Sequence, residues 1–279
     1  MVALGLPAAI WFLIAAGAPA FVTSDPNGGW ASNGYYVHNN MWNRSQYHPC
    51  TSTLTAWSPG HWQVVARMNN QAGDGAVKTY PNVHRDYTHV PITAFESLIS
   101  RFAATAPGTG IYNVAYDLWL NGVASPGCTE LMIWTENRQQ VPGGRFVREA
   151  KFGDHLFKVY RRPTGNYLAF VAATNFAAGT LDLLAMLNWT TAQGWLPATS
   201  TVCQVCFGIE MVSTEDSDAI FRVSEFSLDA RLGTSPTRTN GASSTVEPVA
   251  IPTARRQVGA DRRRRRTTRV GPPDCLAFV

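Results

Sequence analysis

The sequence predicts an all-β protein, a β-sandwich or jelly roll, and three observations support this class. Apolar and polar residues alternate in short segments that Gly, Pro and Asn separate throughout residues 25–232. One segment has the spacing of an amphipathic helix, and no strand–helix–strand rhythm occurs. With 279 residues, 45% of them hydrophobic and 11% aromatic, the chain is able to bury a substantial core.

Eight segments carry the alternation most clearly and are predicted to be strands. They are residues 34–42, 62–66, 110–120, 129–135, 155–161, 167–173, 202–212 and 221–229. A helix is predicted within residues 180–195, because Leu181, Leu184, Leu187 and Trp189 place an apolar stripe on one helical face.

Residues 1–20 have the features of a secretory signal peptide. An apolar stretch of about 17 residues ends at Ala18-Pro19-Ala20, an A-x-A cleavage pattern. The first basic residue is Arg44, so a basic segment does not precede the apolar stretch, and an uncleaved membrane anchor is the alternative. We expect a secreted, extracellular protein without a membrane span in its mature form.

The composition changes after Leu232, which predicts a main domain over residues 21–232 and a disordered tail over residues 233–279. The tail begins with a Ser/Thr/Pro/Gly-rich linker and contains five consecutive arginines at positions 262–266. Three interpretations remain open for it: a solvated tail, the remnant of a lost module, or a segment that binds an anionic polymer or lipid.

Charge and motifs exclude several classes of function for the main domain. Nine of the 23 basic residues but only three of the 19 acidic residues lie in the tail, which leaves the rest of the chain at −2. Nucleic-acid binding by the main domain is therefore not expected. The chain has no GxGxxG after a strand, no GxxxxGK[ST], no HExxH and no GxSxG. The six histidines are interpreted as surface or strand residues: His38, His48, His61, His84, His89 and His155.

The five cysteines predict neither a metal site nor a complete set of disulfides. They are Cys50, Cys128, Cys203, Cys206 and Cys275, an odd number that leaves at least one thiol unpaired. Cys203 and Cys206 have CxxC spacing, but no further ligand cluster follows. On a strand they are expected to point to opposite faces and to remain unpaired core thiols.

Carboxylates inside apolar strands are the most informative residues. Glu130, Asp117 and Glu210 lie within such segments, and a buried charge must be satisfied or functional. Strand alternation places Glu130, Met132 and Trp134 on one face and the intervening aliphatic residues on the other. Asp117 shares a face with Trp119 in the same way. This pattern predicts a concave sheet with acids and indoles above a dry core, the arrangement of a carbohydrate-binding surface; acids exposed on a sheet edge are the alternative.

The sequence resembles glycoside hydrolase family 12, the retaining endo-β-1,4-glucanases or cellulases. Motifs in the family's order extend over roughly residues 30–231. They are Gly34-Tyr-x-Val-x-Asn39-Asn40-x-Trp42, Lys78-x-Tyr80-Pro-Asn82, Asn113-Val-Ala-Tyr-Asp117-Leu-Trp119, Glu130-Leu-Met-Ile-Trp134, Pro142-Gly-Gly, Leu181-Asp-Leu, Phe207-Gly-x-Glu210 and Phe226-Ser. Differences also occur: Asn43 follows Trp42, Met211-Val212 follow Glu210, and no cysteine precedes Cys50 to pair with it.

The resemblance implies a jelly-roll sandwich of two antiparallel sheets with one short helix and a concave substrate cleft. It implies Glu130 as the nucleophile, Glu210 as the general acid/base, and Asp117 as the acid that hydrogen-bonds the nucleophile. Met132 would lie beside Asp117 under the reacting sugar, and Asn40 would contact the nucleophile region. The aromatic residues that would stack on or support the glucan are Trp42, Trp119 and Trp134.

The main hypothesis is a secreted, monomeric, endo-acting β-1,4-glucanase that needs no metal and no organic cofactor. Its partner would be a β-1,4-glucan: cellulose, mixed-linkage glucan or xyloglucan. A non-catalytic glucan-binding module is the alternative, although a lectin has no reason to retain all three acids. A protein that acts through its Arg-rich tail is the third hypothesis.

Overall fold

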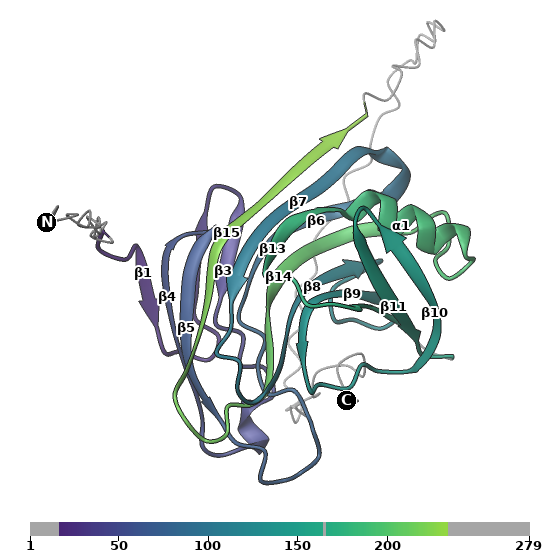
Figure 1. The fold of residues 1–279 in the computed structure, drawn as a ribbon. Helices are drawn as coiled ribbons and strands as arrows, with labels where there is room; N and C mark the ends of the chain where they lie inside the picture. Colours follow the sequence, from purple (N-terminus) through teal and green to yellow (C-terminus); the bar gives the residue numbers. More distant parts are fainter. Residues whose placement is uncertain (1–16, 164–165, 234–279) are drawn as a thin grey trace, which may run out of the picture.

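In the computed structural model, residues 17–163 and 166–233 are described, and they form two curved β-sheets packed face to face (Figure 1). The smaller sheet has six strands in the order β1-β4-β5-β15-β7-β13. Their bounds are β1 (Phe21–Thr23), β4 (Cys50–Ser58), β5 (His61–Met68), β15 (Ala219–Leu232), β7 (Phe95–Thr105) and β13 (Ala178–Asp182).

The larger sheet has nine strands in the order β10-β11-β12-β9-β8-β14-β6-β3-β2. Their bounds are β10 (Arg145–Phe152), β11 (His155–Arg161), β12 (Tyr167–Ala172), β9 (Thr129–Arg138), β8 (Ile111–Leu120), β14 (Thr201–Ser213), β6 (Asn82–Pro91), β3 (Tyr35–His38) and β2 (Gly29–Ser32). Two 3-10 turns, η1 (Arg44–Gln46) and η2 (Ile92–Ala94), and one α-helix, α1 (Leu183–Ala192), complete the elements of the described residues.

The predicted all-β sandwich with one short helix is confirmed, with one correction to its strand directions. β12 pairs with β9 in parallel, whereas the other ladders are antiparallel, so the larger sheet is mixed. The parallel pair arises because the chain leaves β9, forms the β10–β11 hairpin at the edge of the sheet, and then returns as β12 (Tyr167–Ala172) between β11 and β9.

All eight predicted strands form, but the first is shorter than expected. Residues 34–42 yield a strand only over Tyr35–His38, because Asn40 adopts a left-handed backbone with φ of 41° that ends the pleat. Seven strands were not predicted: β1, β2, β4, β6, β7, β10 and β13. The sequence of β6, NVHRDYTHVP, illustrates the reason. Its many polar residues obscure the alternation expected of a strand, but β6 nonetheless pairs with β14 and β3.

The core lies between the sheets and is rich in aromatic side chains. Phe207 of β14 stacks on Phe226 of β15 with ring centroids 5.7 Å apart, and Tyr116 and Phe102 pack against the same ring. These contacts join the two sheets at the centre of the sandwich, where close packing contributes most of the free energy of folding.

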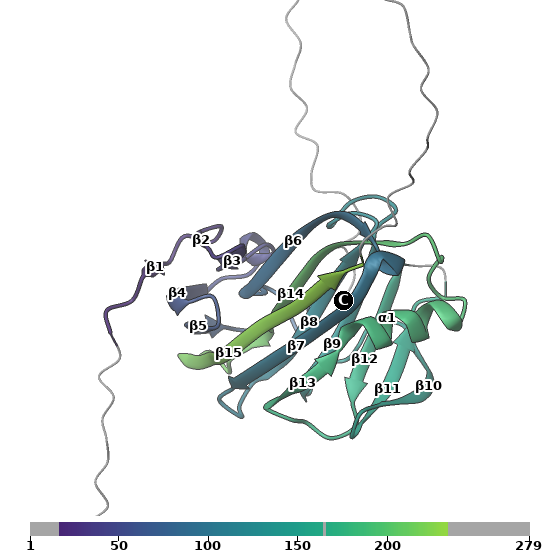
Figure 2. The same cartoon turned by 90° about the horizontal axis from the view of Figure 1, so that it is seen from above.

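Helix α1 packs against the end of the larger sheet (Figure 2). Trp189 meets Phe152 of β10 and Phe170 of β12 edge to face, with centroids 5.8 and 5.7 Å apart. Asp182 caps the helix, since its side chain accepts a hydrogen bond from the Ala185 amide. The buried helical residues are Leu183, Met186, Leu187 and Thr190, so the predicted stripe is displaced by about one position and Leu181 belongs to β13.

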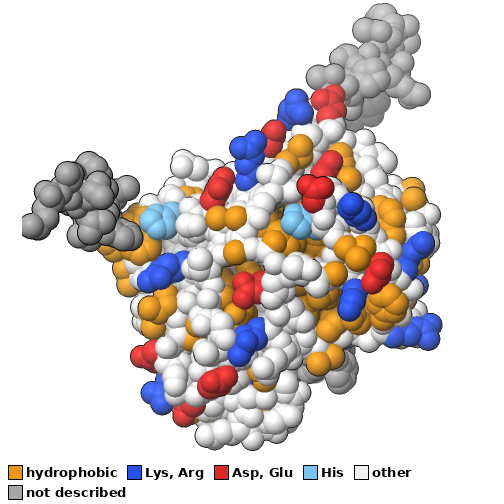
Figure 3. All heavy atoms as spheres, viewed as in Figure 1, with side chains coloured by type: hydrophobic (Ala, Val, Ile, Leu, Met, Phe, Trp, Pro, Cys, Tyr) orange, Lys and Arg blue, Asp and Glu red, His pale blue; other side chains and the backbone are white. Residues whose placement is uncertain are grey.

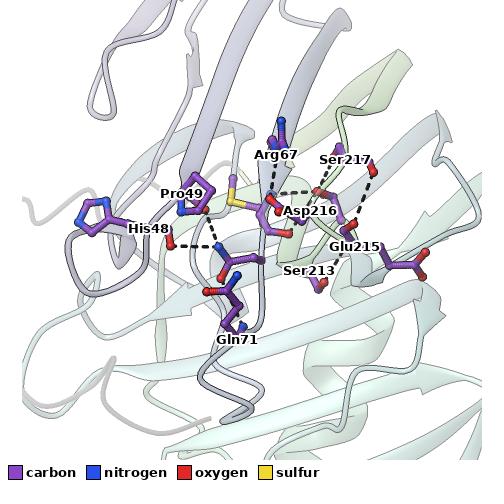
Figure 4. A network of polar contacts seen from close by, with 11 residues as sticks. His48, Pro49, Arg67, Gln71, Ser213, Glu215, Asp216 and Ser217 are labelled. Carbon is purple, nitrogen blue, oxygen red and sulfur yellow. Dashed lines mark hydrogen bonds and ion pairs between the residues drawn. The ribbon is translucent and has the colours of Figure 1, made fainter.

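A polar network fixes the turn between β14 and β15 against the ends of β4 and β5 (Figure 4). Arg67 forms an exposed ion pair with Asp216 at 3.0 Å, and the Asn69 amide donates to the His48 carbonyl oxygen at 3.0 Å. Glu215 and Asp216 adopt positive φ angles of 56° and 54°, a backbone that this short turn requires. An exposed ion pair contributes about 0–1 kcal/mol, so the network determines the shape of the turn more than the stability of the fold.

Cys50, Cys203 and Cys206 are buried free thiols, as predicted for the CxxC pair, and Cys128 is buried as well. Simple alternation does not determine the orientations of Cys203 and Cys206, contrary to the expectation that they point to opposite faces. A bulge between Val202 and Gln204 interrupts the alternation at Cys203, and both thiols lie outside the main core.

Several predictions concern residues that lie outside the described part of the chain, namely most of the predicted signal peptide, the Arg-rich tail and Cys275. On the face shown in Figure 3, acidic and basic side chains are interspersed, in keeping with a nearly neutral main domain. No helix within residues 17–163 and 166–233 combines the length and the apolar character needed to cross a membrane.

We expect Phe207→Ala to lower the free energy of unfolding by about 3–5 kcal/mol, because it removes a fully buried ring that contacts both sheets. Urea denaturation followed by tryptophan fluorescence measures the change. Phe146→Ala is the matched control, since that ring is 52% exposed, and its effect should stay within about 0.5 kcal/mol. Equal losses in the two variants would contradict this view of the core.

Candidate active site

A cleft of about 370 Å³ opens on the face of the larger sheet that points away from the core. Six of the residues predicted for the site line it: Glu130, Glu210, Asp117, Asn40, Trp42 and Trp119. They come from β9, β14, β8 and the segment after β3, which are distant in sequence. The structure therefore brings together both predicted catalytic acids and the third acid beside them.

Strand register explains this placement. Met132 of β9 lies opposite Asp117 of β8, which lies opposite Cys206 of β14, and this row continues to His84 of β6. Glu130 lies opposite Trp119 on the same face. The neighbouring residues Leu131, Ile133, Tyr116 and Leu118 point the other way and belong to the main core, as the sequence predicted.

Glu210 is held by two amide donors. Asn113 Nδ2 and Gln140 Nε2 both donate to its Oε2 atom, at 2.5 and 2.9 Å. Asn113 pairs with Glu210 across the β8–β14 ladder, and Gln140 comes from the turn after β9. These hydrogen bonds favour the carboxylate and lower the pKa of Glu210, whereas its burial has the larger and opposite effect.

Burial raises the pKa values of all three acids, and charge repulsion adds to this effect at Glu130 and Asp117. Burial, followed by the charge of Glu210, raises the pKa of Glu130 to about 8, and the charge of Arg162 partly offsets this. Burial raises the pKa of Asp117 well above its ordinary value, and the charges of Glu130 and Glu210 add to the effect. In the structure the acids titrate as a coupled group, which retains at least one proton at neutral pH.

Asp117 is buried, and its Oδ1 atom has no hydrogen-bond partner among the described residues. A neutral carboxylic acid tolerates such a position far better than a carboxylate does. The structure therefore favours a protonated Asp117 beside the two glutamates, able to act as a hydrogen-bond donor.

Met132 and Trp134 were predicted site residues, but they do not line the cleft. Both are almost fully buried beside the cleft, on the same face of the sheet as Glu130, where the Trp134 indole donates to Met132 Sδ at 3.4 Å. Trp134 cannot stack on a sugar from there, and the two side chains instead support the strand that carries Glu130. Trp42 is 36% exposed and presents its ring to the cleft, whereas Trp119 is 5% exposed and offers only an edge.

The sequence motifs that contain Pro81 and Gly208 lie side by side, with their backbones very close together. The Pro81 carbonyl oxygen accepts from the Ile209 amide at 3.0 Å, and a Cβ atom at Gly208 would lie 2.1 Å from the same oxygen. Only glycine fits at position 208. The crossing places Tyr80 beside the acids, with its hydroxyl donating to the Ala115 carbonyl at 3.0 Å.

The paired asparagines after β3 have separate tasks. Asn39 is fully buried, and its side chain exchanges hydrogen bonds with Ser52 and the Asp25 carbonyl. Asn40 lines the cleft, and its carbonyl accepts hydrogen bonds from Tyr80 and Thr79 at 2.9 and 3.0 Å. Asn39 therefore anchors the segment that Asn40 and Trp42 present to the cleft.

Sequence reasoning missed several residues of the site. His38 and His84 are strand residues, as interpreted, yet both line the cleft beside Tyr36, and the three rings contact one another. Gln140 and Arg162 were missed because they lie in turns that no motif marked. The pairing of β6 with β14 would have indicated that His84 faces the cleft, but β6 itself was not predicted.

No group of three or more His, Cys, Asp or Glu side chains in the described chain is arranged to hold a metal ion. The site supplies two carboxyl groups, which suffice for acetal cleavage by acid/base and nucleophilic steps. A concave sheet with an acid pair and aromatic faces has the elements of a carbohydrate-cleaving site.

Comparison with known proteins places this site in a family. The sequence model of glycosyl hydrolase family 12 matches residues 33–231. Endoglucanase S from Pectobacterium parmentieri is 23% identical over 231 residues, which cover 72% of this chain and 83% of that protein. Because the family match covers well over half of the sequence, this chain belongs to glycosyl hydrolase family 12.

Solved structures support the same fold. The xyloglucanase domain of NopAA, a type three effector from Sinorhizobium fredii in complex with cellobiose, is similar with a TM-score of 0.67 and 21% identity, covering 76% of this chain and 100% of that one. The catalytic domain of Cel12A from Humicola grisea, soaked with a thio cellotetraose, gives 0.68 and 20%, covering 76% and 99%. The predictions of a family 12 jelly roll and of an endo-acting glycoside hydrolase of β-glucans are confirmed.

The raised pKa of Glu130 predicts that the fold loses stability as the pH rises. Its value is about 8 in the folded protein and ordinarily 4.5, so folding favours the neutral acid. The resulting stabilisation is complete below pH 4.5 and is lost as the pH rises to about 8. We expect the wild type to lose on the order of 3 kcal/mol over this interval, and Glu130→Gln to lose much less.

Urea denaturation at pH 5 and pH 8.5 tests this expectation. Glu149→Gln, which changes an exposed glutamate of β10, is the control and should follow the wild type. A Glu130→Gln variant that loses as much stability as the wild type would contradict it.

Proposed function

We propose that this protein cleaves internal β-1,4-glucosidic bonds of β-glucans by double displacement, with Glu130 as nucleophile and Glu210 as general acid/base. The observation that carries these roles is that both acids line one cleft, from β9 and β14 on either side of β8 in the same concave sheet, and that burial raises the pKa of each. A retaining glycosidase requires two such carboxyl groups, one on each side of the scissile bond.

In the first step the Glu130 carboxylate attacks the anomeric carbon while Glu210 donates its proton to the departing glycosidic oxygen. A covalent glycosyl-enzyme ester forms and the aglycone leaves as an alcohol. In the second step Glu210, now a carboxylate, removes a proton from water, which attacks the anomeric carbon and releases Glu130. Two inversions give net retention of configuration.

The productive protonation state has its protons on Glu210 and Asp117, with Glu130 ionised. A protonated Asp117 beside Glu130 adds no charge to the site and is able to donate a hydrogen bond to the nucleophile. The hydrogen bonds from Asn113 and Gln140 to Glu210 stabilise the carboxylate that remains after proton donation, when Glu210 becomes the base.

The opposite end of the cleft suits the glucan chain. Trp42 offers a partly exposed indole face, which matches the apolar CH face of a glucosyl ring. Asn82 Nδ2 donates to the Tyr80 carbonyl, so its Oδ1 atom receives the hydrogen of His84 Nδ1 at 2.8 Å. His84 Nε2 is then left as an acceptor for a sugar hydroxyl, and burial lowers the pKa of His84 to about 4, which keeps the ring neutral.

Relatives named endoglucanase and xyloglucanase support unbranched and xylosylated β-1,4-glucans as the substrates to compare first. A cleft, rather than a closed pocket, suits internal cleavage of a long chain. We further propose that residues 1–20 direct export, that the enzyme acts outside the cell as a monomer, and that it needs no metal or organic cofactor.

Chemical rescue distinguishes the two glutamate roles. We expect Glu130→Ala and Glu210→Ala each to lose at least about 10³-fold in activity on carboxymethyl-cellulose, barley β-glucan and xyloglucan. With an activated aryl cellobioside, azide should restore turnover in both variants, and product stereochemistry is read by NMR. The α-azide is expected from Glu130→Ala, where azide replaces the nucleophile, and the β-azide from Glu210→Ala, where azide opens the glycosyl-enzyme.

The opposite stereochemical pattern would exchange the two roles. A wild type that binds these glucans but releases no reducing ends would instead indicate a binding module. Glu149→Gln, outside the cleft, is the activity control.

We expect Gln140→Met to move the basic limb of the kcat/KM profile to higher pH. The substitution removes a donor to the Glu210 carboxylate, so the pKa of Glu210 rises and the acid stays protonated further into the alkaline range. The shift should be about 0.5–1 pH unit. Gln139→Met, at the exposed neighbouring position, is the control, and an unchanged basic limb in Gln140→Met would refute the expectation.

A further inference from the structure

The cationic residue Arg162 lies in the same row of cross-strand neighbours as Glu130. Tyr167 of β12 lies opposite Glu130 in the parallel β12–β9 ladder. The backbone amide of Arg162 donates to the Tyr167 carbonyl at 3.3 Å, which places Arg162 directly beyond Tyr167 in this row. The order across the sheet is therefore Arg162, Tyr167, Glu130.

The Arg162 guanidinium lies over the Tyr167 ring, 5.2 Å from its centroid. This is within the range of a cation–π contact and fixes a long, otherwise variable side chain above the concave face. The tyrosine is buried, and its hydroxyl contacts Met132 Sδ at 3.5 Å, so the platform under the guanidinium is itself rigid.

The Pro142-Gly-Gly segment closes over this stack. A Cβ atom at Gly143 would lie 3.1 Å from the Tyr167 ring and 3.2 Å from Arg162 Nη2. Glycine at this position allows the backbone to approach both side chains, which restricts the guanidinium to its place on the ring.

We infer that Arg162 is a positioning residue for the reaction, whose charge, fixed on the Tyr167 ring, favours the carboxylate form of the nucleophile Glu130. This inference rests on the proposed function, because it concerns Glu130 in its role as nucleophile. The arginine acts through Glu130 and needs no contact with the substrate.

Within the part of the chain that the structure describes, the other titratable groups next to Glu130 do not supply positive charge. They come from β8, β14, β12 and the segment before β6, and they are Asp117, Glu210, Cys206, Tyr167 and Tyr80. Burial raises the pKa of the tyrosines and of the thiol, so these groups stay neutral. Against two further acids, the Arg162 charge lowers the pKa of Glu130 and offsets part of their effect.

Arg161 offers a matched comparison at the adjacent position. It also stacks on an aromatic ring, with its guanidinium 5.8 Å from the centroid of Trp195. However, Arg161 lies opposite Leu168, a residue of the main core, and so belongs to the other face of the sheet. Both residues are arginines at the end of β11 that stack on an aromatic ring. Only Arg162 lies on the face of the sheet that carries Glu130.

The test measures the pKa of Glu130 without substrate and the pH profile with substrate. Full-length wild type, Arg162→Gln, Arg162→Lys and Arg161→Gln are labelled with ¹³C at the glutamate carboxyl. Glu130→Gln assigns the resonance of Glu130, and near-UV circular dichroism verifies that each variant is folded. The same proteins are assayed for kcat/KM on barley β-glucan over the full pH range.

In Arg162→Gln we expect the Glu130 midpoint and the acid limb of kcat/KM both to rise by about one pH unit, since removing a nearby cation disfavours the carboxylate. At a pH below the limb this corresponds to a loss of about tenfold in kcat/KM, with little change above it. Arg162→Lys should recover most of the shift, and Arg161→Gln should match the wild type.

An unchanged Glu130 midpoint in Arg162→Gln would overturn the inference, and so would a higher KM with an unmoved acid limb, which indicates substrate binding alone. An equal shift in Arg161→Gln would also overturn it, because a general loss of positive charge would then suffice. If the wild type cleaves no glucan, the proposed function fails, while the carboxyl titration still decides whether Arg162 acts on Glu130.

Discussion

The register of β9, β8 and β14 is the constraint on which both the core and the site depend. A shift of one residue in either ladder would exchange the faces of every side chain on the shifted strand. Phe207, Tyr116 and Ile133 would then leave the core, while Glu210 and Asp117 would enter it. The aromatic packing between the sheets therefore fixes the positions of the acids, since the cost of exposing those rings prevents any other pairing.

The site concentrates acidity that the fold must tolerate. Burial is the main cause of the raised pKa values of its three carboxyl groups, and repulsion between ionised groups adds to the effect at Glu130 and Asp117. The surrounding groups divide the protons unequally. Amide donors stabilise the Glu210 carboxylate, the charge of Arg162 lowers the pKa of Glu130, and a hydrogen bond from Trp119 only partly offsets the effect of burial on Asp117. The same asymmetry fits the proposed roles of nucleophile, acid and neutral neighbour.

Local devices position the elements that frame the cleft. The left-handed Asn40 ends β3 and turns Trp42 toward the cleft, and Gly208 lets the Pro81 backbone cross β14. Each device lies within a short motif of the sequence, so local backbone geometry sets the position of the side chains that frame the cleft.

The sequence by itself determined the sandwich class, the outward face of Glu130, Asp117 and Trp119, and the acid pair, because alternation along a strand is a local property. It did not determine β6, β10 or the parallel β9–β12 pair, since partners distant in sequence stabilise those strands. The burial of Met132 and Trp134, the cleft position of His84, and the contacts of Gln140 and Arg162 depended on the curvature of the sheet and on turns. Only the tertiary structure decided these, because they are set by which strands become neighbours and not by the pattern within any one of them.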